Sequence, residues 1–495
     1  MIDVHTHRIF WTIHKYAGLV ACAWLFVLGV TGVLLDHHEW RWLSQNSVPT
    51  SWTSDQINRL VPGTVMRHVV ATPTTIVGGS ERGTWLSSDK GQTWKKVKFQ
   101  GLKHQPQLFG TAGTAGTTFA GVYLATDDGL WALGASGATA RPVALRGDHL
   151  TAISPGHDDR TVVAVRDHTD LLTIEKATGA VVPITRGDRV DGLVGDVAFN
   201  TFVREIHFGR GLLAGEASIW LNDFGGVCLV LLSVTGLSYW LVKRNGKSMG
   251  LSLGARRGAL KWLFRSHGPL VGLVAALPIL YLAVTAIPLN HIYGFIDATK
   301  GWEVPRASLT PAYQGHTLDH EIDGIVAWPN DPGRLLIVSR FGVLDSRDNG
   351  RTWRTEPTLP DPSGMAGANI FRVDDRVFVG RGGGKSIVQV AGTNKWEPLK
   401  GPSTSLTSAT RQGDLWLVKN SKAIYVADDH AAPYADAKIP FKQAVSGTTL
   451  YLFFADIHAG VIFHKEFKWL NDLFAGLAIL LVISGPVIWL RRRWV

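Results

Sequence analysis

Histidines at the ends of apolar segments are the side chains in this sequence best suited to chemistry. Six of them recur in the two halves of the chain with nearly the same spacing and form three pairs: His14 with His267, His37 with His291, and His207 with His458. Histidine inside or at the edge of a membrane helix is costly and usually has a partner. Because imidazole nitrogens bind haem iron from opposite sides, often from facing helices, the pairs predict iron ligands.

The expected cofactor is a b-type haem, which is not covalently attached. Cys22 and Cys228, the two cysteines, lie inside apolar segments and outside any Cys-x-x-Cys-His motif, so a disulfide framework is not expected either. Zinc or copper is an alternative, although the sequence does not show the short spacings of His, Cys and carboxylate that dedicated sites use. For the unpaired His38, His5, His7 and His464, a simple interfacial hydrogen bond is the better interpretation.

The duplication limits how these histidines can share iron. Because both halves have the same order of elements, the pseudo-two-fold axis should run along the membrane normal. A haem on this axis would be bound by a residue and its copy, such as His14 and His267. Two haems off the axis would be bound by mixed pairs: His37 with His458, and His291 with His207.

The sequence favours the mixed pairs. His14 precedes His37 by 23 residues, about 34 Å along a helix, which is too far for one fast electron transfer. We therefore expect two haems b near the outer surface, and the inner pair as a third haem site, a quinol site or a structural position.

The segments that must position these histidines occur twice. Residues 204–244 and 455–493 both begin with Ile-His-x-Gly, continue through Trp-Leu-Asn-Asp and enter an apolar run with a small-residue step, a late tryptophan and a basic end. The first apolar segment and the third match in the same way, since Thr31 precedes His37 by six residues and Thr285 precedes His291 by six. The chain is therefore an internal duplication, with halves of about 1–250 and 251–495.

Four apolar stretches are long enough to cross a bilayer core, which takes about 20 residues. They cover residues 17–35, 224–242, 270–289 and 473–490. Basic residues fill the link between the second and third stretches and follow the fourth. Because basic loops stay in the cytoplasm, we expect a four-pass protein of the bacterial inner membrane with both termini cytoplasmic. Pro278 and Pro288 predict kinks in the third helix.

The two long outer loops predict an all-β periplasmic domain. The first contains the short β-rich runs TTIVGG, GTWLSS, GVYLAT, LWALG and TVVAVRD, and the second contains RLLIVSR, GVLDS, RVFVGR, DLWLVKN, AIYVADD and TLYLFF. This pattern is typical of repeated antiparallel sheets. Residues 87–94 and 346–353 share the frame S-x-D-x-G-x-T-W, which resembles the Asp-box turn of β-propeller proteins. We expect three or four blades from each loop, closing one shared propeller, because an open half would leave bare sheet edges.

Composition agrees with a membrane part joined to a large water-exposed part. The chain is 45% hydrophobic, has a mean hydropathy of +0.09 and carries a net charge of +10, and the basic link explains part of that charge. We see no basic stripe on a folded face, which argues against nucleic acid as a partner. The expected domains are residues 1–40 (first helix), 41–203 (first β half), 204–295 (second and third helices), 296–454 (second β half) and 455–495 (fourth helix).

The histidine frame of the helices resembles the PepSY-associated transmembrane helix family. The likeness rests on His-x-x-x-Gly followed by Thr-Gly in the first helix, on Ile-His-x-Gly before the second and fourth, and on His267 at the start of the third. It covers about a third of the chain and implies that His14, His207, His267 and His458 correspond to the recurrent histidines of the family. Members include inner-membrane ferrisiderophore reductases that bind b-type haem. Typical members carry small PepSY modules, whereas this chain carries the β-rich loops.

These observations predict an inner-membrane haem protein that transfers electrons to a periplasmic acceptor, such as a ferric siderophore or other ferric chelate, from quinol or another donor. Membrane lipid surrounds the helices, and the expected fold is four helices in a 2+2 duplication with a β-propeller-like cap. The alternative is a membrane-anchored propeller that binds a partner or acts in assembly without redox activity.

Overall fold

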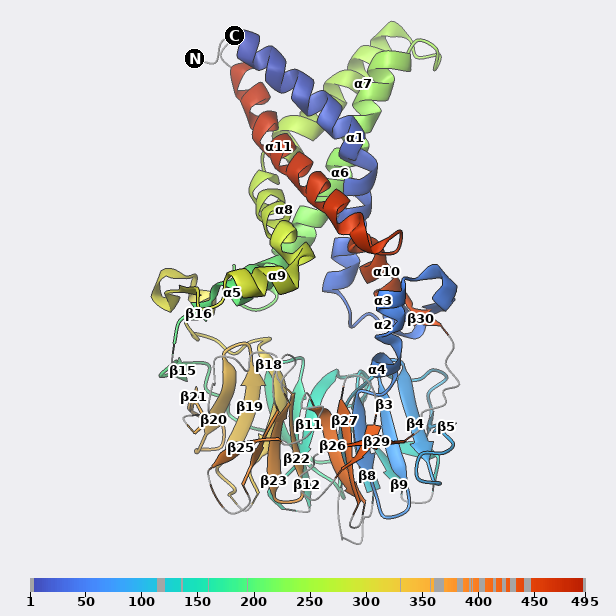
Figure 1. The fold of residues 1–495 in the computed structure, drawn as a ribbon, viewed down its shortest axis with the longest axis vertical. Helices are drawn as coiled ribbons and strands as arrows, with labels where there is room; N and C mark the ends of the chain where they lie inside the picture. The colour runs from blue at the N-terminus through green and yellow to red at the C-terminus, as the bar shows by residue number, and fades with distance from the viewer. Residues whose placement is uncertain are drawn as a thin grey trace.

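The computed structural model has a helical part and a β part. It describes residues 4–113, 121–134, 137–158, 160–193, 195–329, 331–356, 358–359, 369–380, 386–390, 393, 395–399, 406–412, 415–420, 424–427, 433–439 and 447–492. The helices gather at one end of the molecule and the sheets at the other, and the first and last long helices begin and end far from the sheets (Figure 1). The chain is therefore a membrane-type helical bundle with a large all-β domain.

Three helices are long and apolar enough to cross a membrane. They are α1 (Val4–Asp36), α6 (Ala217–Asn245) and α11 (Lys468–Arg492). Each helix includes one of the expected apolar stretches, and large apolar side chains such as Val20 and Leu231 are exposed on them, as expected for contact with lipid. These helices confirm a membrane protein, whereas the fourth span depends on a broken helix.

The broken helix comprises α7 (Leu253–Arg265), the π-helical segment η2 (Ser266–Gly272) and α8 (Ala276–Asn290). The two pieces meet at 66° and count as a fourth span only if they are taken together. The bend lies after η2, which contains Pro269. At the end of η2, the Leu273 amide donates a hydrogen bond to the Gly268 carbonyl, five residues earlier. Pro278 and Pro288 lie within α8. The main break is thus at a π-helical turn with a proline, a common cause of sharp bends, and away from the two prolines that the sequence analysis selected.

Six sheets make up most of the β part, three from each half of the chain. The first half gives β2–β5 (His68–Ala71, Ile76–Ser80, Gly83–Ser87, Lys95–Lys96), β6–β10 (Lys98–Phe99, Leu108–Gly113, Gly121–Thr126, Gly129–Gly134, Thr139–Ala144) and β11–β14 (Leu150–Pro155, Thr161–Arg166, Asp170–Glu175, Val181–Pro183). The second half gives β18–β21 (Ile322–Ala327, Leu335–Ser339, Gly342–Ser346, Trp353–Thr355), joined by β15 (Val190–Asp191), then β22–β25 (Asn369–Val373, Arg376–Gly380, Ile387–Gln389, Trp396–Pro398) and β26–β29 (Leu406–Gln412, Leu415–Asn420, Ile424–Ala427, Pro433–Ile439).

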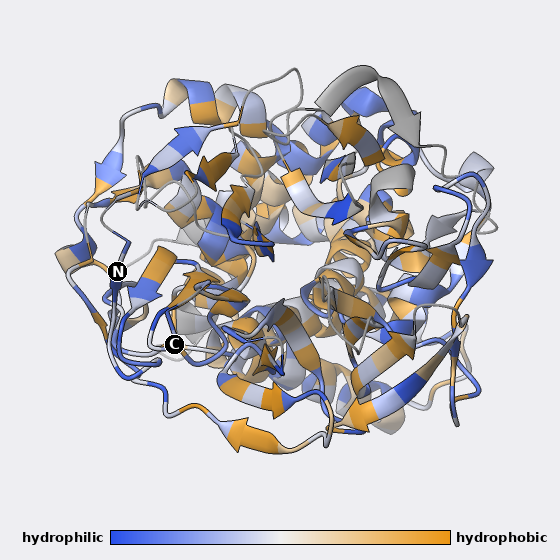
Figure 2. Ribbon diagram, turned by 90° about the horizontal axis from the view of Figure 1, so that it is seen from below, coloured by the Kyte–Doolittle hydropathy of each residue, from blue (hydrophilic) through white to orange (hydrophobic). Residues whose placement is uncertain are grey.

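The first long strands of the six sheets contact one another in a closed order: β2, β7, β11, β18, β22, β26 and again β2. Seen along the long axis, the sheets surround a common centre (Figure 2). Separate apolar clusters fill the spaces between neighbouring sheets, one of them around Trp131 and another around Trp353. The two halves are hydrogen-bonded where they meet, since the Ala71 amide donates to Thr410 Oγ1 at 2.8 Å. The halves therefore build one common β domain.

Short elements join the two parts of the molecule. Two-stranded pairs, β1 (Ser47–Val48) with β30 (Thr448–Thr449) and β16 (Val197–Ala198) with β17 (Glu303–Val304), tie the outgoing and returning chains. The short helices are α2 (Arg41–Gln45), α3 (Asp55–Asn58), α4 (Val61–Val65), α5 (Phe199–His207), α9 (Ile292–Ala298) and α10 (Leu450–His458).

One expected strand is a helix. The run TLYLFF, residues 449–454, lies almost wholly in α10, because Thr449 caps this helix by accepting a hydrogen bond from the Leu452 amide. The other ten β-rich runs of the sequence each contain a strand. The capped helix matters for function, since its last residue is His458.

The two S-x-D-x-G-x-T-W turns have the same hydrogen bonds. Asp89 accepts from the amide and the hydroxyl of Thr93 at 2.8 and 2.5 Å. Asp348 accepts from the amide and the hydroxyl of Thr352 at 2.9 and 2.8 Å. Gly91 and Gly350 both have φ +87°, which other residues rarely adopt. These turns connect neighbouring strands, β4 to β5 and β20 to β21, so their role is structural.

Candidate metal centres in the helical bundle

The inner histidine pair is close enough to share a metal ion. His14 lies on α1 and His267 lies in η2, and their ring centroids are 6.1 Å apart with the planes at 84°. Two imidazoles that bind one ion from opposite sides at roughly 2.0–2.1 Å have their nitrogens about 4 Å apart and their centroids about 6 Å apart. The inner pair therefore has the spacing of two axial ligands.

Hydroxyl groups set the tautomer of both inner histidines. Nδ1 of His14 is 2.9 Å from Ser484 Oγ, and Nδ1 of His267 is 3.0 Å from Thr235 Oγ1. Each hydroxyl donates its one proton to the carbonyl four residues earlier, at 2.6 Å in both cases. Since the proton of the hydroxyl is used, the histidine Nδ1 must be the donor, and the lone pair is left on Nε2. This is the form of imidazole that binds a metal ion, with a hydrogen bond that fixes the ring.

The outer pair repeats this arrangement at the other end of the bundle. His207 ends α5 and His458 ends α10. Their Nδ1 atoms lie 2.9 Å from Thr285 Oγ1 and 2.8 Å from Thr31 Oγ1. Both threonine hydroxyls donate to the carbonyl four residues earlier, at 2.7 Å. All four histidines therefore present Nε2, and each pair consists of a residue and its copy.

Electrostatics also favours neutral rings in the outer pair. Desolvation among the surrounding helices, with a smaller effect of the neighbouring His458, lowers the pKa of His207 to about 4. Desolvation alone lowers the pKa of His458 to about 4. A neutral imidazole is the metal-binding state at neutral pH.

Small residues next to the hydroxyls leave room for the rings. A Cβ atom added at Gly236 would be 3.0 Å from His267 Cε1, one at Gly485 would be 3.5 Å from His14 Cε1, and one at Gly32 would be 3.6 Å from His458 Cε1. Each glycine follows the Thr or Ser whose hydroxyl binds the same ring. The fourth position is Ala286, after Thr285. The small residue in each apolar run thus leaves space for one histidine ring to pack against the helix backbone.

The Asn of each Trp-Leu-Asn-Asp motif holds the helix end that carries an outer histidine. Asn222 Nδ2 donates to the His207 carbonyl at 2.8 Å, and Asn471 Nδ2 donates to the His458 carbonyl at 3.0 Å. The Tyr281 hydroxyl donates to Asn222 Oδ1 at 2.5 Å, so this amide is itself fixed. The motif therefore positions the outer pair, a role that the sequence analysis did not assign.

His37 and His291 are bound to carboxylates instead of facing another histidine. Nε2 of His37 is 2.9 Å from Asp223 Oδ2, and Nε2 of His291 is 2.6 Å from Asp472 Oδ2. Although desolvation lowers the pKa of His37, the hydrogen bonds and charges of Asp223 and Glu39 outweigh it and raise this pKa. The structure thus brings His14 together with its copy His267, and it places a carboxylate where the mixed pairs would need an open Nε2.

The two centres are closer than the sequence predicts. His458 lies at the level of Thr31, which follows His14 by 17 residues on α1, a rise of about 26 Å. The expected separation of about 34 Å used His37 as the outer ligand. With this smaller separation, the electron-transfer distance no longer requires both centres to lie near the outer surface.

A cavity of about 490 Å³ adjoins the inner pair. Its walls are mostly apolar, and they include His14, His267, Gly236 and Gly485. The volume is within the usual range for a cofactor site. In the described part of the chain, no group of three or more His, Cys, Asp or Glu side chains is arranged to hold a metal ion, so each candidate centre offers two protein ligands.

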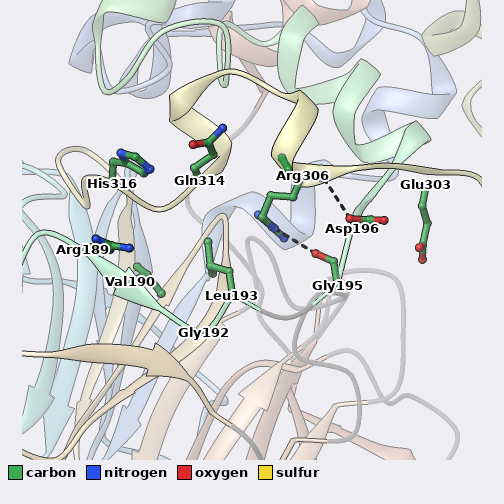
Figure 3. A pocket seen from close by; sticks show the side chains of 11 residues that line it. Arg189, Val190, Gly192, Leu193, Gly195, Asp196, Glu303, Arg306, Gln314 and His316 are labelled. Carbon is green, nitrogen blue, oxygen red and sulfur yellow. Dashed lines mark hydrogen bonds between the residues drawn. The ribbon is translucent and has the colours of Figure 1, made fainter.

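A second cavity of about 830 Å³ lies between the β domain and the chain segments that lead to the helices (Figure 3). Arg306, Asp196 and Arg189 on its wall already have partners. The Arg306 amide donates to Asp196, the Arg306 guanidinium donates to the Gly195 and Tyr313 carbonyls, and Arg189 lies 3.5 Å from Asp191. This cavity therefore favours no single class of ligand.

The comparisons agree with the helical frame. The family model of the PepSY-associated TM region matches residues 11–492. No curated protein sequence matches the chain. The resemblance noted for about a third of the chain thus extends over nearly all of it.

Solved structures give only weak matches. An ancestral GH74 enzyme aligns with 75% of this chain and 38% of its own, at 10% identity and a TM-score of 0.34. A protein of unknown function from Bacteroides thetaiotaomicron aligns with 73% of this chain and 68% of its own, at 9% identity and a TM-score of 0.37. The tricorn protease aligns with 86% of this chain and 41% of its own, at 10% identity and a TM-score of 0.30. The chain thus spans about two fifths of the GH74 enzyme, and likenesses this low carry no argument about function.

Proposed function

The chain belongs to the PepSY-associated TM region family, and we propose that it is a membrane electron-transfer protein with two b-type haems, one held by His14 and His267 and the other by His207 and His458. One observation carries the proposal: four histidines form two pairs, and a hydroxyl group holds each ring in the tautomer that presents Nε2.

The ligand set suits a haem better than a bare metal ion. Each pair gives two imidazoles, and the porphyrin supplies the other four nitrogens of an iron centre. The 6.1 Å separation of the inner rings and the cavity beside them support this choice. The cysteines Cys22 and Cys228 are free thiols and lie outside any attachment motif, so the haem would be of b type.

Bound haem would supply a one-electron carrier at each end of the bundle. The residues of the chain supply the rest. The hydroxyl oxygens accept hydrogen bonds from the Nδ1–H groups and so increase the basicity of the ligands; they belong to Thr31, Thr235, Thr285 and Ser484. The glycines beside them let the rings approach the helix backbone, and Asn222 and Asn471 fix the ends of the two outer ligand helices.

The proposed topology has four spans, with α7, η2 and α8 together forming one of them. The basic link between α6 and α7 supports a cytoplasmic position for the inner pair. The outer pair and the β domain would then be periplasmic. Six sheets in a closed order of contacts support a six-bladed β-propeller cap, built jointly by the two halves.

Electrons would pass from a cytoplasmic or membrane donor, such as a quinol, through the inner centre to the outer centre and on to a periplasmic acceptor. The outer pair lies at the end of the bundle that faces the β domain (Figure 1), which supports an acceptor bound between bundle and cap. A ferric siderophore or other ferric chelate is the acceptor that the family resemblance suggests.

Haem counting in histidine variants tests the proposal. The purified chain should contain two haems by pyridine haemochrome, and His14→Ala or His458→Ala should each leave about one. His37→Ala and His38→Ala are matched controls at the outer surface that should keep both, because Nε2 of His37 bonds Asp223. Loss of haem in the His37 variant equal to that in the His458 variant would contradict the assignment. A colourless, folded preparation would favour a membrane-anchored propeller that binds a partner.

A further inference from the structure

The cavity beside His14 and His267 has a basic rim. Lys15 on α1 and Lys243 and Arg244 at the end of α6 line the cavity. The remaining lining is mostly apolar, so the cavity has an apolar body and a cationic edge. Such a shape fits a flat apolar ligand that carries acidic groups on one side.

Among the described residues, no acidic side chain lies at this end of the bundle to neutralise the rim; Asp3 is outside the described residues. The sequence has no Asp or Glu in residues 4–35, 224–296 or 473–495. The rim cations lie instead over aromatic rings: the Lys15 and Lys243 Nζ atoms are 5.5 and 5.2 Å from the Trp11 ring, and the Arg244 guanidinium is 5.2 Å from the Trp240 ring. These contacts hold the side chains near the cavity without neutralising their charges.

Basic residues at a cytoplasmic helix end also have an ordinary role in membrane topology. That role needs charge on the right side of the membrane and does not require the charge to line a cavity. Lys247 and Arg257 belong to the same basic link, and neither lines the cavity. They therefore provide a control for charge alone.

We propose that Lys15, Lys243 and Arg244 bind the two carboxylates of the porphyrin held by His14 and His267, so that the acidic edge of this haem faces the cytoplasm. The inference rests on the proposed function. It follows from three features together: two facing imidazoles, an apolar cavity between the helices, and cations at the cavity rim that have no acidic side chain nearby among the described residues. A carboxylate at the edge of the cavity would accept charge-assisted hydrogen bonds from these groups.

The test compares two porphyrins that differ only in their carboxylates. The full-length chain, freed of haem in detergent, is titrated with iron protoporphyrin IX and with its dimethyl ester, followed by the Soret band. The variants are Lys243→Gln/Arg244→Gln and Lys15→Gln, and the controls are Lys247→Gln and Arg257→Gln. Exposed ion pairs are weak, so we expect the free acid to bind up to about fivefold more weakly to the Lys15→Gln variant and up to about thirtyfold more weakly to the double variant. The ester should bind all variants equally.

The outcomes separate this inference from the proposed function. If the rim variants weaken the free acid and the ester equally, or if the control variants weaken the free acid as much as the rim variants, the carboxylate assignment is overturned while His14-dependent haem binding stands. If His14→Ala removes no haem, the proposed centre itself is wrong. A loss that is specific to the free acid and to the rim variants supports the inference.

Discussion

The clearest quantitative prediction concerns the glycine that contacts His267. A Cβ atom at Gly236 would be 3.0 Å from His267 Cε1, tighter than about nine in ten real contacts of this kind. One at Gly485 would be 3.5 Å from His14 Cε1, which is an ordinary contact. The two glycines occupy equivalent positions in the duplication and serve the same centre. Alanine should therefore weaken haem binding at position 236 and leave it unchanged at position 485, although both positions hold glycine beside a histidine of the same centre.

The magnitude follows from the contact distance. To accept the new methyl group of Gly236→Ala, the His267 ring must move by a few tenths of an ångström, while metal–ligand distances are held to within about 0.2 Å. Overpacking of this kind costs about 1–3 kcal/mol. At 1.4 kcal/mol for each factor of ten, this corresponds to about five- to 150-fold weaker haem binding at the inner centre.

The assay is the rate of haem transfer from the purified chain to an apoprotein acceptor, together with haem counting. Gly236→Ala should release one of its two haems much faster than the wild type, and Gly485→Ala should behave like the wild type. Equal release rates in the two variants would refute the assigned ring contacts. Retention of both haems at the wild-type rate in Gly236→Ala would refute the role of His267 as a ligand.

Three further predictions address the outer centre and the β domain. Thr31→Val removes the acceptor of the His458 Nδ1 proton, so the outer haem should become easier to reduce, by on the order of 20–60 mV in a redox titration; an unchanged or lower potential would contradict this. Hydrogen bonds from Thr93, the hydroxyl first and then the amide, lower the pKa of Asp89 to about 2. The stabilising effect of this carboxylate is therefore complete above about pH 4 and is lost as the pH falls towards 2. Asp89→Asn should reduce this part of the acid sensitivity measured by circular dichroism, and an unchanged acid profile would argue against the turn. Arg334→Met leaves the buried carboxylates of Asp345 and Glu356 without their closest cation. This variant should destabilise the β domain by about 3–5 kcal/mol in thermal unfolding. A change below about 1 kcal/mol would show that these two ion pairs are dispensable.

Much of the architecture could be predicted because it depends on local sequence patterns. Apolar stretches of spanning length gave three confirmed helices, and ten of eleven β-rich runs contain strands. The exception, residues 449–454, has the composition of a strand but begins with Thr449, whose side chain caps a helix. Threonine is a favoured helix cap, but the position three residues later is Leu452, where a capping box would have Glu or Gln, so the sequence signal for α10 is weak.

The candidate site was predicted only in part. The six histidines were visible from the duplication, but their partners depend on how the helices pack. His37 and His458 are near one another in the expected topology, yet the former bonds Asp223 and the latter bonds Thr31. Sequence offsets place residues along a helix, whereas helix rotation and tilt decide which side chains face each other.

The sequence by itself determined that the chain is a duplicated membrane protein with a large β-rich part and recurrent histidines, since periodicity, composition and internal repeats are properties of the sequence order. The tertiary structure alone decided that His14 meets its own copy, His267, that a hydroxyl from another helix fixes each of these two rings, and that the cations of α1 and α6 share one cavity. The physical reason is that a hydrogen bond or a metal pair depends on distances of a few ångströms between segments that lie hundreds of residues apart. Only the packing of the helices sets those distances.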